Sequence, residues 1–148
     1  MKCALNTNKS RIAFLRGAGA KIGDKCIIRD ITALGSEPWL VEIGDNVSFS
    51  SNVKIITHDG SVARLYHMEL TERQYDYFGQ VKIGSNCFLG MNSIILKNVT
   101  VGNNVIIGAG SIVTKSIPDN CIVCGVPAKI IGTVNDFTEK TKHFLMTP

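Results

Sequence analysis

Aliphatic residues recur at every sixth position through the second half of the chain. The series runs Ile83, Leu89, Ile95, Val101, Ile107 and Val113. A helix would bring apolar residues back every three or four positions, and a simple strand every second position. A period of six fits neither element, so it indicates a repeated structural unit.

A second small or β-branched residue follows each member of this series after four positions. These residues are Cys87, Ser93, Val99, Val105, Ser111 and Ile117. Val105 and Ile107 are two apart across the repeat boundary, so both point to one face of a short strand. Gly, Asn, Asp and Ser fill the positions between, because they tolerate positive φ or bond their own backbone. The pattern predicts an all-β fold, a parallel β-helix with three sides and about eighteen residues per coil.

The register breaks in two places. An earlier run through Ile43, Phe49 and Ile55 shows the same period, and another begins at Ile22. The slip at GSEPWLVE predicts a bulged corner that carries Trp39. The repeat is absent from residues 59–80, which predicts an excursion loop, and loops of this size in compact domains are commonly functional. Residues 132–148 are expected to form a short helix or a frayed end that caps the last coil. The whole chain, residues 1–148, is thus predicted to be one domain.

Composition sets the broad class of the protein. The chain has 148 residues, of which 45% are hydrophobic and 19% charged, as expected for a globular protein. Its start lacks the apolar run of a secretory signal, so we expect a cytoplasmic location. The net charge of +4 is dispersed, unlike the dense basic face of a nucleic-acid binder. Five cysteines leave one unpaired, which favours reduced thiols. We interpret the Cys121 and Cys124 pair as small core residues rather than a metal or redox site.

The stretch IGSNCFLGMNSIILKNVTVGNNVIIGAGSIVTKSIPDNCIVCGVPAKIIG resembles the hexapeptide-repeat acyltransferases. Its ending, GAGSIVTKSIP followed by GVPAK, is similar to the branch of sugar and xenobiotic O-acetyltransferases, and the resemblance extends from about residue 22 to residue 131. It implies a left-handed coil, although right-handed crossovers are the rule for parallel strands. It also implies acetyl-CoA as co-substrate, a saccharide acceptor in surface polysaccharide assembly, and no metal.

His58 stands where the repeat gives way to the loop. From residue type alone, a solvated loop histidine is the more common case. The resemblance implies instead that His58 is the general base that accepts the proton of the acceptor hydroxyl, a contribution of about 10²–10⁴-fold. Its second ring nitrogen then needs an acceptor, which Asp59, Glu42 or a main-chain carbonyl could supply. His67 is either structural or acceptor-facing, and His143 is expected to be solvated.

Further site residues follow from the resemblance alone. It places coenzyme A against Phe88, Met91, Ala109, Thr114, Lys115 and Lys129. The two lysines would supply positive charge for phosphates, although without the motif they would be interpreted as ordinary solvated lysines. Many relatives have Trp in place of Phe88 and Ser in place of Met91. An oxyanion contact through the backbone N–H of Met91 would be kept here, whereas one that requires the Ser hydroxyl would be lost. Asp30 is the nearest candidate for binding the acceptor.

The last expectation concerns the oligomeric state of the protein. Val99, Ile106, Ile112 and the loop aromatics Tyr66, Tyr75, Tyr77 and Phe78 are expected to expose more apolar surface than a monomer usually tolerates. The resemblance implies that a homotrimer buries this surface and places the donor groove between subunits.

Other functions remain open at this point. An N-acetyltransferase of an amino sugar would use the same residues. A metal hydratase like the γ-type carbonic anhydrases needs three imidazoles on adjacent coils, and here only His58 and His67 are near the predicted coils. A non-catalytic binding or scaffold role would leave His58 dispensable.

Overall fold

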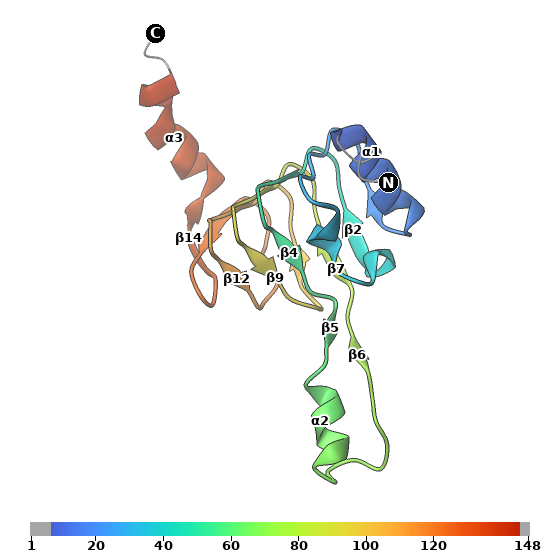
Figure 1. Cartoon of the computed structure of the whole chain (residues 1–148). Coiled ribbons are helices and arrows are strands. Elements are labelled where there is room, and N and C mark those ends of the chain that lie inside the picture. The colour runs from blue at the N-terminus through green and yellow to red at the C-terminus, as the bar shows by residue number, and fades with distance from the viewer. Residues whose placement is uncertain (1–6, 146–148) are drawn as a thin grey trace.

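Three sheets, parallel except for the edge strand β14, wrap around one core in the computed structural model, which describes residues 7–145 (Figure 1). The first sheet has the order β1 (Lys21–Ile22), β2 (Val41–Ile43), β7 (Val81–Ile83) and β10 (Thr100–Val101). The second has the order β14 (Lys129–Thr133), β13 (Cys121–Cys124), β11 (Ile106–Ile107), β8 (Phe88–Leu89) and β3 (Ser48–Phe49). The third has the order β12 (Ile112–Val113), β9 (Ile94–Ile95) and β4 (Lys54–Ile55).

The chain visits these sheets in rotation. β7, β8 and β9 lie in the first, second and third sheets, and β10, β11 and β12 repeat that order. Each strand pairs in parallel with the strand one coil earlier, as Val101 does with Ile83. Corner residues such as Ser85 and Asn103 bond each other at a separation of 18 residues. In this part of the chain, six residues lead from one sheet to the next, and eighteen residues bring the chain back to the same sheet.

The side chains that point into the core are those that the six-residue period predicts. Both series of marked residues from Ile83 to Ile117 are buried, including Ser93 and Ser111. Val99 belongs to them with 1% of its surface exposed, so the expectation that it faces outward is wrong. Ile106 and Ile112 point outward and are half-buried. One continuous core thus runs along the coils.

A ladder of asparagines supports one corner. Asn46, Asn86, Asn104 and Asn120 all have φ between 54° and 62°, a left-handed conformation that asparagine tolerates better than most residues. Each side-chain amide donates to the next one along the coils, with N–O distances of 2.9, 3.1 and 2.9 Å. The polar corner positions of the repeat therefore stabilise the stacking of coils.

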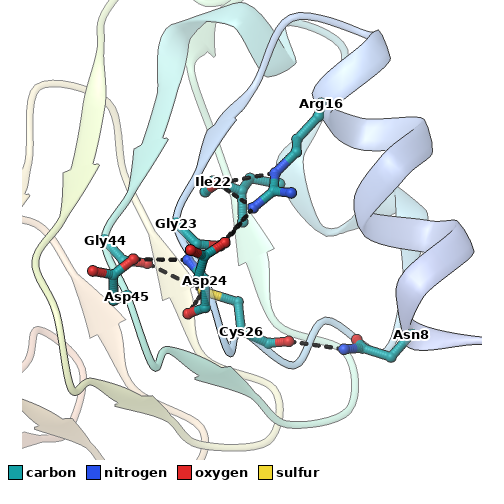
Figure 2. A network of polar contacts seen from close by, with 8 residues as sticks. All are labelled: Asn8, Arg16, Ile22, Gly23, Asp24, Cys26, Gly44 and Asp45. Carbon is teal, nitrogen blue, oxygen red and sulfur yellow. Dashed lines mark hydrogen bonds and ion pairs between the residues drawn. The ribbon is translucent and has the colours of Figure 1, made fainter.

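A helix that the periodicity does not indicate covers the first coil. Helix α1 (Asn8–Gly17) begins with a capping box in which Thr7 and Ser10 exchange hydrogen bonds. Figure 2 shows Arg16 donating to the carbonyl oxygens of Ile22 and Gly23 and pairing with Asp24. α1 therefore closes the coil end that would otherwise expose its core.

The predicted bulged corner is present and consists of two short 3₁₀ turns. These are η2 (Ile31–Leu34) and η3 (Pro38–Leu40). Trp39 is 60% exposed, and Glu37 lies between the two turns.

The excursion forms an arm, residues 58–80, that projects from the coils (Figure 1). It leaves through β5 (His58–Asp59), carries helix α2 (Val62–His67) near its tip, and returns through β6 (Tyr77–Phe78). β5 and β6 pair in antiparallel fashion, His58 with Phe78 and Asp59 with Tyr77. The segment without the repeat thus leaves the coils as an arm, and two paired strands form its base.

The last described element is a helix, which leads away from the coils. β14 folds back onto β13 in antiparallel fashion, and α3 (Val134–Leu145) then leads away from the sheets (Figure 1). In this hairpin Val123 of β13 is buried, whereas β14 is mostly exposed. Within residues 7–145, no helix combines the length and apolar character needed to cross a membrane.

Candidate active site

His58 lies where the third sheet ends and the arm begins. It follows β4 by two residues, and its side chain is 48% exposed. A cavity of about 280 Å³ opens beside it, lined by Thr32, Gly35, Lys54, Ile55, Ile56, Thr57 and His58. The imidazole therefore forms part of the wall of a space large enough for a small polar group.

Glu37 orients this imidazole. Its Oε2 lies 2.9 Å from Nδ1 of His58 and accepts a second hydrogen bond, at 2.6 Å, from Oγ1 of Thr57. A carboxylate accepts hydrogen bonds, so Nδ1 carries the proton and Nε2 is left as an acceptor. The Thr57 hydroxyl, and next His58, lower the pKa of Glu37 below its ordinary value. The carboxylate is therefore ionised near neutral pH and can stabilise a protonated imidazole.

The expectation that Asp59, Glu42 or a main-chain carbonyl accepts from the second ring nitrogen of His58 is therefore wrong, because Glu37 does so. The Asp59 carboxylate instead accepts from the backbone N–H and hydroxyl of Ser61 and pairs with Lys97. Glu42 pairs with Lys21 on the first sheet. The register slip is the signal that could have indicated Glu37, because it marks an irregular segment beside the coil of His58.

Gly35 brings this segment close to the third sheet. Its φ is 70°, and a Cβ on it would lie 3.0 Å from the carbonyl oxygen of Ile55. A side chain here would meet both backbone strain and a crowded contact. Gly35 thus allows the bulge to place Glu37 beneath His58.

His67 does not take part in this site. His67 lies at the end of α2 and packs its ring against Tyr66, with centroids 5.6 Å apart. α2 lies toward the tip of the arm, whereas β5, which contains His58, lies at its base (Figure 1). The side chain of His143 lies outside the described part of the structure, so its expected solvation is untested. The ring of Phe78, by contrast, contacts His58 edge-on at 6.2 Å.

Asp30 caps η2 at the border of the cavity. Its carboxylate accepts from the backbone N–H and hydroxyl of Thr32 and pairs with Lys54 at 3.3 Å. The backbone N–H of Thr32 is the main cause of its lowered pKa. Asp30 thus holds Thr32 and Lys54, which line the cavity.

The residues expected to bind the donor lie at two different corners. Phe88, Met91 and Ala109 lie at or near the corner between the second and third sheets, where Gly110 bonds Met91 of the coil before. Thr114 and Lys115 follow β12 at the corner shared with His58, and both are exposed. The third sheet separates the two groups, and Lys129 begins β14. One chain therefore does not gather all six around His58.

No group of three or more His, Cys, Asp or Glu side chains is placed to hold a metal ion in the part of the chain that the structure describes. Burial raises the pKa of the Cys26 and Cys87 thiols, and both, like Cys121 and Cys124, are free. Cys3 lies outside the described residues.

Comparison with known sequences identifies the repeat. The family model for the bacterial transferase hexapeptide (six repeats) matches residues 80–115. The protein CapG of Staphylococcus aureus is 46% identical over 128 residues, which cover 85% of this chain and 73% of CapG. The galactoside O-acetyltransferase of Escherichia coli K12 is 39% identical over 108 residues. That match covers 73% of this chain but only half of the relative.

Solved structures show the same fold. A maltose O-acetyltransferase from Clostridium difficile matches with a TM-score of 0.64 and 28% identity, over 90% of this chain and 81% of its own. The N-acyltransferase AntD from Bacillus cereus, in complex with dTDP and 3-hydroxybutyryl-CoA, matches with a TM-score of 0.58 and 27% identity. That match covers 86% of this chain and 73% of AntD.

Proposed function

The chain belongs to the hexapeptide-repeat transferases, in their sugar O-acetyltransferase branch, and we propose that it transfers an acetyl group from acetyl-CoA to a sugar hydroxyl. The observation that carries the proposal is the pairing of His58 with Glu37 at the edge of a cavity. The pairing holds the ring by Nδ1 and leaves Nε2 to face an acceptor, and an alcohol acceptor needs such a ring nitrogen as its general base.

The reaction follows from this geometry. The acceptor hydroxyl donates to Nε2 of His58, and its proton moves there as the oxygen bonds to the thioester carbon. The imidazolium is then stabilised by the Glu37 carboxylate, as in other base and orienter pairs. Collapse of the tetrahedral intermediate breaks the carbon–sulfur bond, and the proton passes from Nε2 to the leaving thiolate. No acetyl-enzyme forms.

The donor site is completed between subunits in this proposal. The coils form a left-handed, three-sided prism, as in the family, and three chains assemble into a homotrimer. The separation of Met91 and Ala109 from Lys115 by the third sheet supports this arrangement, because the two corners can face each other only across neighbouring chains. The relative AntD holds an acyl-CoA, which supports the same class of donor here.

Exposed apolar residues support the assembly. Phe88, Met91, Ile130 and Ile131 have between 45% and 63% of their surfaces exposed, and the arm adds Met68, Leu70, Tyr75 and Phe78. A trimer would bury part of this surface. We place the reaction in the cytoplasm and the acceptor among precursors of a surface polysaccharide.

N-acylation is the second candidate, favoured by the likeness to AntD. The same base could accept a proton from an amine once it attacks the thioester. The two activities differ in the bond formed, an ester or an amide.

One experiment tests both. The full-length protein is incubated with acetyl-CoA and separate sugars, amino sugars, nucleotide sugars and lipid-linked oligosaccharides, and thiol release is followed. Mass spectrometry then identifies the product, and mild alkali distinguishes a labile ester from a stable amide. An ester on a sugar supports the proposal, whereas an amide selects the second candidate. Absence of thiol release with all acceptors and of acetyl-CoA binding would contradict both.

A further inference from the structure

The base of the arm is held by two consecutive residues of the next coil, Lys97 and Asn98. β4 and β9 run in parallel with Ile55 opposite Ile95. If this register is continued for two more residues, Lys97 lies alongside Thr57, which is the residue immediately before His58. The arm therefore leaves and returns directly beside these two side chains.

Lys97 contacts both strands of the arm. Its Nζ lies 2.8 Å from Oδ2 of Asp59 on the outgoing strand and 4.6 Å from the ring centroid of Tyr77 on the returning strand. Only 17% of the Lys97 side chain is exposed, against 35% for Asp59. Exposed ion pairs contribute little to stability, but a largely buried ammonium with a carboxylate and an aromatic face is a stronger contact.

Asp59 is fixed from a second direction. Its Oδ1 accepts from the backbone N–H of Ser61 at 3.0 Å and from the Ser61 hydroxyl at 2.6 Å. Lys97 first, and then Ser61, hold the pKa of Asp59 well below its usual range. The carboxylate is therefore charged at neutral pH and shared between the coil and the start of the arm.

Asn98 holds the returning strand. Its Nδ2 donates to the hydroxyl of Tyr77 at 3.1 Å. Gly79 lies very close to Asn98: a Cβ on Gly79 would be 2.3 Å from Oδ1 of Asn98 and 3.0 Å from the backbone nitrogen of Asn98. The backbone N–H of Gly79 also donates to the carbonyl oxygen of Thr57 at 2.7 Å. The two strands thus meet the coil at fixed positions.

We propose that Lys97 is a positioning residue of the acetyl transfer, because it fixes the base of the arm and thereby the imidazole of His58. Asp59 and Tyr77 form the strand pair next to His58 and Phe78. By contacting both Asp59 and Tyr77, Lys97 keeps these two residues opposite each other. The neighbouring pair, His58 and Phe78, then stays in register, and the His58 ring stays between Glu37 and Phe78. The expected effect on catalysis rests on the proposed function, whereas the expected effect on the arm does not.

Hydrogen exchange tests the structural part without any substrate. Lys97→Met keeps the aliphatic stem and removes the charge, Lys97→Arg keeps the charge, and Lys82→Met alters an exposed lysine of β7 as a matched control. In Lys97→Met we expect amides of residues 59–79 to exchange about tenfold faster, while those of β8 to β12 keep their rates. Lys97→Arg and Lys82→Met are expected to match the wild type. Unchanged exchange in Lys97→Met would overturn the proposal.

Activity and the signal of His58 test the catalytic part. With acetyl-CoA and the best saccharide acceptor from the panel, kcat of Lys97→Met should fall about tenfold with KM for acetyl-CoA unchanged. The side-chain NMR signal of His58 should move or broaden in Lys97→Met and be restored in Lys97→Arg. A looser arm with full kcat and an unchanged His58 signal would overturn the positioning role.

The two proposals fail separately. Full activity of a His58→Ala variant contradicts the proposed base, whatever Lys97 does to the arm. An inactive His58→Ala variant together with an unaltered arm in Lys97→Met contradicts only the role of Lys97.

Discussion

The Oε2 atom of Glu37 lies 2.9 Å from Nδ1 of His58, although 21 residues separate them in the sequence. Glu37 comes from the bulge between η2 and η3, and His58 from the junction of coil and arm. Neither residue belongs to the repeat. The site is thus built where the coils depart from their regular pattern.

His58→Ala should lower kcat by about 10²-fold or more, because the acceptor hydroxyl loses its base. The affinity for acetyl-CoA, measured by calorimetry, should stay within about twofold, since we place the imidazole on the acceptor side. His67→Ala, in the arm but away from the cavity, is the matched control and should keep more of its activity. Turnover of His58→Ala at the wild-type rate would remove His58 from the mechanism.

Glu37→Gln should lower kcat about tenfold or more with little change in KM. An amide can turn its N–H toward Nδ1 and so place the ring proton on Nε2, the wrong tautomer for a base. Glu42→Gln, which changes a surface glutamate paired with Lys21, should keep its activity. Equal kcat in both variants would contradict the role of Glu37 as orienter.

The stability contributed by Glu37 should depend on pH. Its pKa is lowered in the folded protein from an ordinary value of 4.5. The contribution is therefore fully present above that value and is lost as the pH falls through the folded pKa. Urea unfolding should show a difference between wild type and Glu37→Gln that shrinks as the pH falls below about 4.5. A difference that grows below this pH would contradict the assignment.

Cys87→Ala should destabilise the protein by about 1–2 kcal/mol without altering kcat. The Cys87 thiol is buried and lies 3.1 Å from the carbonyl oxygen of Gly102. Cys124→Ala should cost less, because Cys124 is only half-buried. Rapid-quench mass spectrometry should trap no acetyl-cysteine during turnover. A stoichiometric acetyl adduct would show that transfer is not direct.

Lys129→Glu should weaken acetyl-CoA binding at least about tenfold by reversing a charge expected beside phosphate. Light scattering should show the variant and the wild type as the same trimer. An active wild-type monomer would contradict a donor site shared between chains. Unchanged affinity in Lys129→Glu would remove that residue from the site.

Gly79→Ala should disturb the arm, whereas Gly60→Ala should be tolerated. A Cβ on Gly79 meets the side chain and backbone of Asn98, and one on Gly60 meets no described atom within 4 Å. Crowding of this kind typically costs about 1–3 kcal/mol. Limited proteolysis should therefore cleave the arm faster in Gly79→Ala than in Gly60→Ala. Equal cleavage would show that the close approach of Gly79 to Asn98 is unimportant.

The sequence alone determined the coils, their inward rows and the place of the excursion. From β7 to β12 the paired strands are 18 residues apart, so Leu89 and Ile107 occupy equivalent positions of a pattern that repeats along this part of the chain. His58 could be singled out because it stands where this rule ends.

Only the tertiary structure decided how that histidine is used. The bulge that carries Glu37, the contact of Lys97 with Asp59 and the docking of Arg16 on the first coil all depend on where irregular segments pack against the coils. Periodicity fixes the backbone of the strands but not the direction of a side chain in a bulge or an arm. Those directions follow from contacts between residues distant in the sequence, and the candidate site is made of such contacts.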